Sequence, residues 1–561
     1  MKRYFRKFLS SIIFSGFGIF TLLFFSPLEV YMGNPNDFRF FIDSALFILG
    51  IASLASTLLF SAAVSFLPTK ILKVLNLTVF SLGICYYLQA LLLNGSLSIL
   101  TGENFSVATS TVIVNILIWC LIFAVVFASW YIFKKLCKER LYINTVKYIA
   151  LALIAMQLTG FFSMYISYDK NVNLSKSLYC STEGQLEVSK NNNVIYFVID
   201  YCDTRFVNDA LNEDPSLFEY FNGFTYYEDN VFTHSRTFPA ITYMLSGEKC
   251  YYDKDYKDYV NDSIRDSEFL NEIDDSGADI RLYTDPKLVG TDSNKLFDNY
   301  KKDDKIGANM KIKGFLIQSL KVSGFRGMPY IAKKHFFYDT ESVNASSIAQ
   351  THDVAPINDD LAFYDSLLSD KVSVNENYSS AFRFYHMFGS HPGATINENA
   401  EYMMWVSLSQ ALRGDLKIIE EYLEQLKSIG AYDDSTIIIT ADHGEYKGRF
   451  DKPQTCLLMV KEAGADTTKP IQISQAQVSH ENIFPTIIKA IGNDHTKYGK
   501  ALDEVSETET VKRYIYNTEV DDETRYETVM KEYLIEGDAS DMNNYSATGR
   551  EWNVNSTVYN N

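Results

Sequence analysis

Five apolar runs near the amino terminus constrain this chain more than any other feature of its sequence. They cover roughly residues 9–31, 45–67, 74–93, 111–133 and 146–167. Each approaches or exceeds the ~20 residues that a helix needs to cross a bilayer. Basic residues precede the first run, as in a signal peptide, but no small-residue cleavage site follows it. The sequence therefore predicts a transmembrane domain of five helices over residues 1–167, and five successive runs disfavour the alternative of amphipathic core helices.

The charges of the loops predict the orientation of these helices. The amino-terminal segment, the loop at 70–73 and the segment 134–147 are basic, whereas the loops near 32–44 and 94–110 contain only Arg39 as a basic residue. Because basic loops tend to stay in the cytoplasm, the amino terminus is expected inside. An odd number of spans then places everything after residue 168 outside. We expect a multi-pass protein of the cell membrane with an extracytoplasmic carboxyl-terminal part.

The two parts of the chain differ in charge. Residues 1–167 carry a formal charge of +7 and the remainder carries −25, for a total of −18. This acidic balance argues against a nucleic-acid partner, since phosphate contacts need clustered Lys and Arg. Four cysteines would face outside, where two disulfides are possible and the sequence leaves the pairing open: Cys180, Cys202, Cys250 and Cys456.

The part after the spans has the pattern of an α/β domain. Residues 168–192 are polar and are expected to form a linker. β-rich segments follow at 194–199, 280–283, 382–388, 435–440 and 456–460, with helical patterns between them, of which the clearest covers about 397–428. Alternating strands and helices predict a mostly parallel sheet covered on both faces. We expect this domain over 193–505, followed by a small β-rich appendage over 506–561.

Acidic residues end two of the predicted strands. Asp200 follows the segment 194–199, and Asp442 and His443 follow the segment 435–440. A single acid at such a position often only caps the next turn. The carboxyl ends of parallel strands, however, lie at one edge of the sheet, where ligands bind. Carboxylates with an imidazole suit Mn²⁺, Zn²⁺ or Mg²⁺ better than Ca²⁺. The sequence therefore predicts a site for one divalent cation.

A third element is the run HSRTFPAITYMLSGE, from His234 to Glu248. Its proline and its glycine match the start and the stop of a helix that would begin near Thr237. Free backbone N–H groups and the helix dipole attract a phosphate or sulfate at such an end. An ordinary threonine N-cap is the alternative for Thr237.

Together these residues resemble the alkaline phosphatase superfamily, in particular its sulfatase-like branch. The similar features are the strand-ending Asp200, the ten-residue spacing from Thr237 to Gly247, and the run Asp442-His443-Gly444. The resemblance covers about 193–505, and lipoteichoic acid synthase-like members also carry five transmembrane helices before an extracellular domain. It implies that Asp200, Thr237, Asp442 and His443 form the metal and nucleophile set.

Two departures from the family pattern narrow what the resemblance implies. Lipoteichoic acid synthases and phosphoethanolamine transferases usually have Glu at the position of Asp200. Sulfatases use a Cys or Ser that is converted to formylglycine, whereas Thr237 cannot be converted. An ordinary sulfatase is therefore disfavoured.

Further candidates lie near these motifs. His391, in the run FGSHPG, matches a family histidine that lies close to the substrate, so we expect it to protonate a leaving oxygen or to hydrogen-bond a phosphoryl oxygen. A turn histidine beside a proline is the alternative. His480 matches a segment that is usually structural. Asp203 and Arg205 are expected at the solvated surface rather than on a phosphate.

These observations predict a membrane-anchored, metal-dependent extracytoplasmic phosphotransferase. Thr237 would take a phosphoglycerol- or phosphoethanolamine-type group from a membrane lipid donor and pass it, through a phosphothreonine, to a cell-envelope glycan or polyol. A sulfatase-like phosphodiesterase or sulfuric ester hydrolase with water as acceptor would use the same residues. The alternative from another class is a non-catalytic envelope scaffold.

Overall fold

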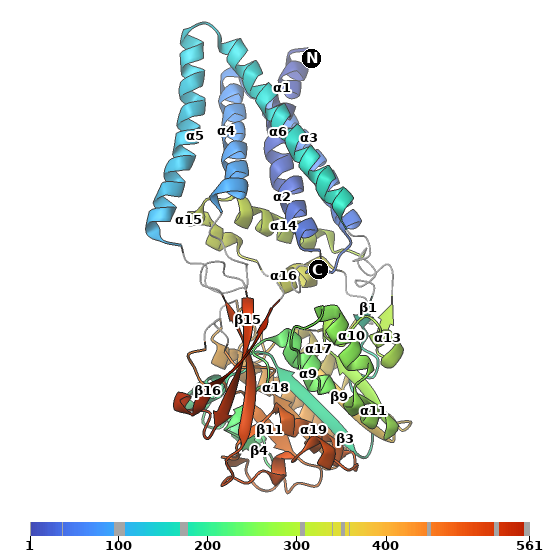
Figure 1. Ribbon diagram of the computed structural model, residues 1–561. Coiled ribbons are helices and arrows are strands. Elements are labelled where there is room, and N and C mark those ends of the chain that lie inside the picture. Colours follow the sequence, from blue (N-terminus) through green and yellow to red (C-terminus); the bar gives the residue numbers. More distant parts are fainter. Residues whose placement is uncertain are drawn as a thin grey trace. The chain divides into compact units, whose positions relative to one another are not determined.

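The computed structural model describes most of the chain (Figure 1). The described residues are 2–35, 37–94, 107–168, 178–302, 309–338, 340–348, 354–357, 359–404, 406–445, 450–520 and 527–554. Two compact units are formed. The first contains Met1–Ser177 and Asp304–Ala349, and the second contains Leu178–Asp303 and Gln350–Asn560. A segment from the middle of the predicted α/β domain thus belongs to the unit of the apolar helices.

Among its described residues, the first unit contains five helices that are long and apolar enough to cross a membrane, which confirms the predicted number. They are Arg3–Gly33, Ile42–Val64, Thr69–Leu93, Thr109–Lys135 and Glu139–Ser167. Their elements are α1 (Lys2–Phe20), η1 (Thr21–Phe25), α2 (Ser26–Gly33), α3 (Ile42–Val64), α4 (Thr69–Leu88), η2 (Gln89–Leu93), α5 (Thr109–Lys135) and α6 (Glu139–Ser167). Large apolar side chains such as Phe47, Leu92 and Leu117 are exposed on them, as on lipid-facing helices. These features are those of a membrane protein.

The described residues of the segment 304–349 pack against these helices. It forms α14 (Ile312–Gly327), α15 (Tyr330–Lys333), η5 (Lys334–Phe336) and α16 (Thr340–Ser347), beside α2 and α4 (Figure 1). The hydroxyls of Tyr86 and Ser323 lie 2.5 Å apart, and Arg326 Nη2 lies 2.8 Å from Glu29 Oε1. A Cβ on Gly327 would lie 2.0 Å from the Tyr86 ring, so only glycine allows this close approach. The segment is thus an integral part of the first unit.

The second unit contains a seven-stranded sheet, in the order β12-β4-β11-β10-β3-β9-β6. The strands are β12 (Gln472–Ser474), β4 (Thr225–Tyr227), β11 (Leu458–Lys461), β10 (Ser435–Thr440), β3 (Asn193–Ile199), β9 (Ser380–Met387) and β6 (Ala278–Tyr283). Only β11 runs antiparallel to its neighbours. In register, Thr440 lies opposite Val198, and Ile199 opposite Met387. The mostly parallel sheet is confirmed, and the carboxyl ends of its three central strands are aligned.

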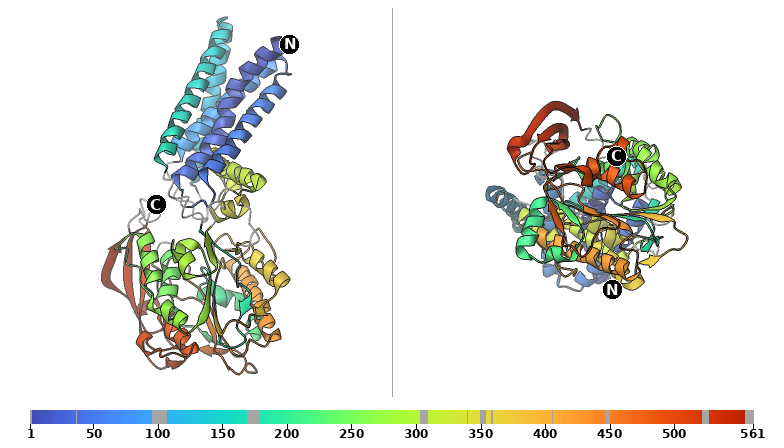
Figure 2. Two further views of the ribbon diagram at one scale, coloured as in Figure 1. Left: turned by 90° about the vertical axis from the view of Figure 1, so that its right-hand side faces the viewer. Right: turned by 90° about the horizontal axis from the view of Figure 1, so that it is seen from below.

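Helices cover both faces of this sheet (Figure 2). One layer contains α8 (Thr204–Glu213), α17 (Asp360–Asp370) and α18 (Leu408–Ser428); the other contains α9 (Thr237–Ser246), α10 (Tyr256–Arg265), α11 (Glu268–Asp275) and α19 (Ile483–Ala490). The short helices are α12 (Pro286–Val289), α13 (Ser293–Leu296), η3 (Leu217–Tyr220), η6 (His480–Asn482), η7 (Thr496–Tyr498), η8 (Leu502–Glu504) and η9 (Met542–Asn544). The predicted start of α18 near residue 397 is wrong. The helix begins at Leu408, because Ser407 and Gln410 form a capping box there.

The stretch predicted as a linker, 168–192, is partly folded into the second unit. Residues 169–177 lie outside the described residues. After them, β1 (Leu178–Cys180) pairs with β7 (Tyr300–Lys302), and β2 (Glu187–Val188) pairs with β8 (Ser373–Val374). All seven cysteines of the chain are free, so neither possible disulfide is formed.

The carboxyl-terminal appendage is β-rich, as predicted. Its strands β14 (Lys512–Val520), β15 (Glu527–Glu536) and β16 (Tyr545–Asn553) form an antiparallel sheet. A further small pair joins β5 (Asn230–Val231) to β13 (Val478–Ser479). The buried guanidinium of Arg513, on β14, lies 2.7 Å from Asp229 Oδ1. Because a buried charge needs its partner, this ion pair ties the appendage to the main sheet unit.

Candidate functional site

The ends of β3 and β10 bring together three of the four predicted ligands of a metal. Asp200 follows β3, and Asp442 and His443 follow β10. All three are buried, and they offer ligand atoms that lie within 4.8 Å of one another. His443 Nε2 lies 3.9 Å from Asp200 Oδ1 and 3.5 Å from Asp442 Oδ2. The cluster follows directly from the parallel pairing of the two strands.

Backbone groups orient Asp442 and His443. Asp442 Oδ1 accepts hydrogen bonds from the backbone N–H groups of Tyr201 (3.0 Å) and His443 (2.8 Å). His443 Nδ1 lies 2.8 Å from the Gly444 carbonyl oxygen. Because a carbonyl can only accept, Nδ1 carries the proton and the lone pair of Nε2 faces the carboxylates. Both residues thus direct a ligand atom, Asp442 Oδ2 and His443 Nε2, toward the same point.

The remaining atoms of the cluster fit a divalent cation. Among the described residues, the buried Asp200 Oδ1 and Asp442 Oδ2 have no hydrogen-bond partner, and such buried polar atoms are rare. Burial raises the pKa of Asp200 well above its usual range, and the adjacent charge of Asp442 raises it further. Burial also acts on Asp442, but the charge that His443 and His386 carry when protonated, together with hydrogen bonds such as that from the Tyr201 N–H, outweighs burial and lowers the pKa of Asp442. Two carboxylates with one imidazole nitrogen suit Mn²⁺, Zn²⁺ or Mg²⁺.

Thr237 is the first residue of α9, and its side chain faces this cluster. Its Oγ1 lies 3.2 Å from His443 Nε2. The helix has proline in its first turn and ends where Gly247 adopts a φ of +81°. The N-cap position itself is taken by Arg236. The Thr237 hydroxyl therefore contacts the candidate ligands.

The appendage holds the segment that leads into Thr237. Tyr516, on β14, donates its backbone N–H to the Thr233 carbonyl (2.8 Å) and accepts from the Ser235 N–H (3.2 Å). Arg236, directly before Thr237, forms an ion pair with Glu527 of β15. No sequence pattern indicates this role of the appendage, because these partners lie far from Thr237 in the chain. The structure makes the appendage part of the frame of the site.

His391 lies one aromatic ring away from the cluster. The Tyr201 ring is 5.9 Å from the His391 ring and 5.5 Å from the His443 ring, centroid to centroid. His391 Nδ1 lies 3.0 Å from the Pro392 carbonyl oxygen, to which it donates. The Tyr201 ring thus lies between His391 and the cluster.

Sequence reasoning missed His386, which lies in the buried strand β9. Its Nε2 is 3.8 Å from Asp200 Oδ2 and has no hydrogen-bond partner among the described residues. Its Nδ1 is 3.0 Å from Thr284 Oγ1. Burial lowers the pKa of His386 to about 4, so the imidazole is neutral at physiological pH. The sequence signal for His386 was a histidine within an apolar strand. Such a residue usually belongs to the core, so it did not stand out as part of a site.

The turn after β9 packs against the backbone of Asp200. Gly389 adopts a φ of +65°, and a Cβ there would lie 2.7 Å from the Asp200 nitrogen. The buried Asp360 accepts hydrogen bonds from the N–H groups of Phe388 (3.0 Å) and Gly389 (2.9 Å). The turn is thus pressed against the Asp200 backbone, and its shape fixes where the carboxylate lies.

Asp203 and His480 are buried in the frame of the site. Asp203 was expected at the solvated surface, but it is buried and accepts hydrogen bonds from the N–H groups of Arg205 (2.9 Å) and Glu445 (3.0 Å). It therefore caps α8 and fixes the loop after His443. His480 is also buried, with Nε2 3.6 Å from Cys456 Sγ.

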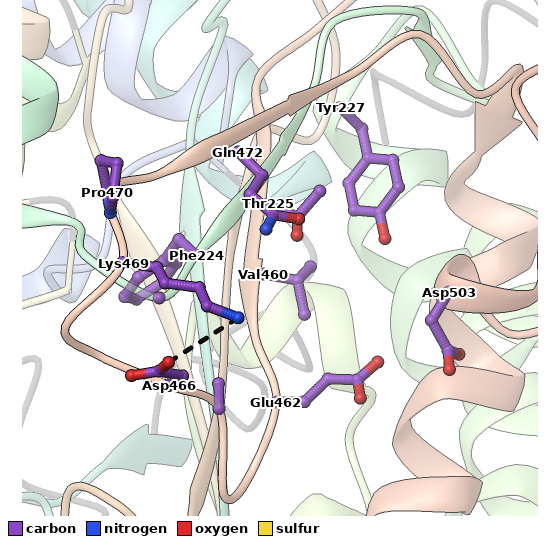
Figure 3. Close-up of a pocket in the computed structure, with 12 residues that line it drawn as sticks. Phe224, Thr225, Tyr227, Val460, Glu462, Asp466, Lys469, Pro470, Gln472 and Asp503 are labelled. Carbon is purple, nitrogen blue, oxygen red and sulfur yellow. Dashed lines mark ion pairs between the residues drawn. The ribbon is translucent and has the colours of Figure 1, made fainter.

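A separate cavity of about 250 Å³ lies at the other end of the strands (Figure 3). Its walls include Glu462, Asp503 and the ion pair of Lys469 with Asp466. Glu462 follows Lys461, which pairs with Ile437 in the first half of β10. The candidate ligands follow the opposite end of β10. The cavity is therefore not part of the cluster.

Comparisons with known proteins give similar solved structures. No protein-family model matches the chain, and no curated protein matches it. The lipoteichoic acid synthase LtaP from Listeria monocytogenes is 14% identical, with 69% of this chain and 93% of that chain covered and a TM-score of 0.36. The lipooligosaccharide phosphoethanolamine transferase A from Neisseria meningitidis, an integral membrane protein, is 13% identical, with 87% and 96% covered and a TM-score of 0.32. A protein in the alkaline phosphatase superfamily from Vibrio parahaemolyticus is 13% identical, with 66% and 81% covered and a TM-score of 0.34.

Proposed function

We propose that this chain is a membrane-anchored, metal-dependent phosphotransferase that works outside the cytoplasm. The observation that carries the proposal is the position of Thr237: its hydroxyl lies at a helix start, 3.2 Å from His443 Nε2 and beside two buried carboxylates with unpartnered oxygens. A hydroxyl, an anion-attracting helix end and a cation site at one point suit an attack on a phosphate ester.

Each residue of the site has a proposed part in the first half of the reaction. When bound, a divalent cation would lower the pKa of the Thr237 hydroxyl and stabilise negative charge on the phosphoryl group. Asp200, Asp442, His443 and the Thr237 hydroxyl would hold that cation. The Thr237 hydroxyl loses its proton to water, Oγ1 forms a bond to phosphorus, and the bond from phosphorus to the lipid alcohol breaks. His391, in its imidazolium form, is the proposed donor of the proton that the leaving oxygen takes up, and it becomes neutral in this step.

The second half of the reaction releases the phosphoryl group from Thr237. A hydroxyl of a cell-envelope glycan or polyol attacks phosphorus and its proton passes to the neutral His391. The bond to Thr237 Oγ1 breaks, and Oγ1 regains a proton from water. A membrane lipid as donor agrees with the membrane-spanning helices of the same chain. A phosphoglycerol- or phosphoethanolamine-type group is the proposed cargo. With water in place of the acceptor, the same residues would catalyse hydrolysis.

The orientation is proposed from the basic loops of the spans. A cysteine introduced at Asn191 should react with an impermeant thiol reagent in intact cells, and one at Glu139 should not. Cys120 and Cys137 are first replaced by serine, because both are exposed and would react with the reagent themselves. Reaction at Glu139 alone would reverse the proposed orientation.

The metal site is tested by its stoichiometry in the full chain. We expect about one equivalent of a divalent cation, because Asp200, Asp442 and His443 are the group of metal-ligand type found among the described residues. Asp442→Ala should remove most of the affinity, and Asp466→Ala, at an exposed acid, should leave it unchanged. Two equivalents, or full affinity in Asp442→Ala, would contradict the single site.

The nucleophile and the type of reaction are tested together. A fluorescent phosphatidylglycerol-type lipid is offered with and without a glycan acceptor. Diacylglycerol release should be nearly abolished in Thr237→Ala and partly retained in Thr237→Ser, which keeps a hydroxyl. Release that rises with acceptor and labels it supports transfer. Release at one rate with water alone, and no labelled acceptor, would show a hydrolase instead.

A further inference from the structure

The segment 304–349, which belongs to the first unit, is basic in its middle although the surrounding part of the chain is acidic. Between Met310 and Tyr338 it contains six basic residues and no acidic one, although the chain after residue 167 carries a net charge of −25. The basic residues are Lys311, Lys313, Lys321, Arg326, Lys333 and Lys334. Lys333 is buried and Arg326 forms an ion pair with Glu29, so the exposed positive charge comes from the other four lysines, which favours contact with an anionic surface.

One face of α14 combines exposed lysines with exposed apolar residues. Lys313, Ile317, Leu320 and Lys321 follow the i, i+4, i+7, i+8 spacing of a single helix face. All four are exposed, and Leu320 retains 42% of its accessible surface. Ile331 of α15 is exposed as well. Apolar residues flanked by lysines are typical of helices that lie in a bilayer interface.

The opposite face of α14 is fixed to the spans. Phe315 and Val322 are fully buried in a cluster with residues of α2 and α3. Tyr31 and Ser319 are hydrogen-bonded through their hydroxyls at 3.0 Å. Further along, Asn115 Oδ1 accepts from the Tyr330 N–H at 3.1 Å. The exposed face of α14 therefore cannot turn inward without breaking these contacts.

The level at which α14 is attached places its exposed face at the membrane interface. It contacts α2 and η2, which end their spans at Gly33 and Leu93. The start of α5 contributes Asn115 to the same region. Leu92 and Val114 are exposed apolar residues at these span ends. The exposed face of α14 thus continues the lipid-facing surface of the spans.

We propose that the exposed face of α14, with Ile331, lies in the bilayer interface and binds anionic phospholipids. Ile317, Leu320 and Ile331 would enter the boundary of the acyl chains, and Lys313 and Lys321 would contact phosphate groups. This inference rests on the membrane spans and is independent of the reaction proposed for Thr237. A phosphodiester lipid held there would be enriched on the membrane surface of the enzyme.

The test uses the full chain in nanodiscs of phosphatidylcholine and phosphatidylglycerol, with Cys120 and Cys137 replaced by serine. A cysteine at Leu320 carries an environment-sensitive fluorophore, and one at Ile473 serves as the control, because Ile473 is an exposed apolar residue of β12 with 60% of its surface accessible. We expect blue-shifted emission at 320 that nitroxide-labelled lipid quenches severalfold more than at 473. Emission at 320 as in water would overturn the proposal. Blue-shifted emission at 320 that nitroxide-labelled lipid does not quench would assign the face to a protein partner or a second copy. This result would also overturn the proposal.

The preference for anionic lipid is tested in the same nanodiscs. Trace phosphatidylglycerol with a labelled headgroup should quench the fluorophore at 320 severalfold more than equally labelled phosphatidylcholine. The preference should be lost in Lys313→Gln/Lys321→Gln and kept in the control Lys295→Gln/Lys469→Gln, at exposed lysines of the second unit. Equal quenching by both lipids in the unsubstituted face would refute anionic recognition. None of these readouts requires turnover, so an inactive Thr237 leaves them unchanged.

Discussion

Replacing Gly389 by alanine should damage the metal site more than the fold. An L-residue in the left-handed region costs about 1–2 kcal/mol. The added Cβ would also lie 2.6 Å from Ile199 Cγ2, 2.7 Å from the Asp200 nitrogen and 2.9 Å from the Asp200 oxygen. Overpacking of this kind costs about 1–3 kcal/mol. The sum is ~2–5 kcal/mol, and because two of these atoms are backbone, relief of the clash must move Asp200.

Gly430 provides a matched control for this substitution. Its φ is +71°, close to the +65° of Gly389, and a Cβ there meets nothing within 4 Å. Gly430→Ala should therefore cost only the backbone strain, about 1–2 kcal/mol, and leave metal affinity unchanged.

The assay combines two measurements on the purified full chain. Denaturant unfolding gives the loss of stability, and titration calorimetry gives the affinity for Mn²⁺ or Zn²⁺. A displaced ligand should lower the affinity of Gly389→Ala about 10–100-fold, as for a lost supporting contact. If Gly389→Ala binds the cation as tightly as Gly430→Ala does, the turn does not position Asp200 and the reasoning is refuted.

Two further predictions concern the frame of the site. Glu527→Gln removes the ion-pair partner of Arg236 and should lower kcat more than it raises KM, at a stability cost of about 1–2 kcal/mol; Glu536→Gln, at an exposed position of the same strand, is the control, and equal kinetics for the two variants would refute a positioning role. Burial lowers the pKa of His480 to about 4, so the stability that its neutral form contributes, up to about 3 kcal/mol, is present above pH ~6.5 and is lost as the pH falls toward 4. His480→Gln should therefore make unfolding, followed by circular dichroism, less steeply dependent on pH in this range than in the control His335→Gln, and an unchanged pH dependence would contradict this.

Much of the architecture could be predicted because it is written in local patterns. A membrane span and a buried parallel strand are both continuous apolar runs, distinguished by length. The five spans and the central strands were therefore visible without coordinates. The strand-end rule then predicted that Asp200 and Asp442 lie at one edge of the sheet, since residues that follow adjacent parallel strands meet there.

The start of α18 shows where local patterns fail. Apolar residues continue upstream of Leu408, but the side chain of Ser407 accepts a hydrogen bond from the Gln410 N–H. This N-cap fixes the point at which the helix begins. The burial of Asp203 was likewise not visible in the local sequence. An aspartate two residues before an arginine suggests a solvated pair, whereas the fold buries Asp203, which accepts a hydrogen bond from the Glu445 N–H.

By itself, the sequence determined the five spans, the alternation of strands and helices, and the acids at two strand ends, because each depends on residues close together in the chain. Only the tertiary structure decided three other features: segment 304–349 returns to the spans, β14 holds the approach to Thr237, and His386 and the turn at Gly389 lie against Asp200. The physical reason is that hydrogen bonds and close contacts between segments far apart in the chain leave no periodic trace in either segment.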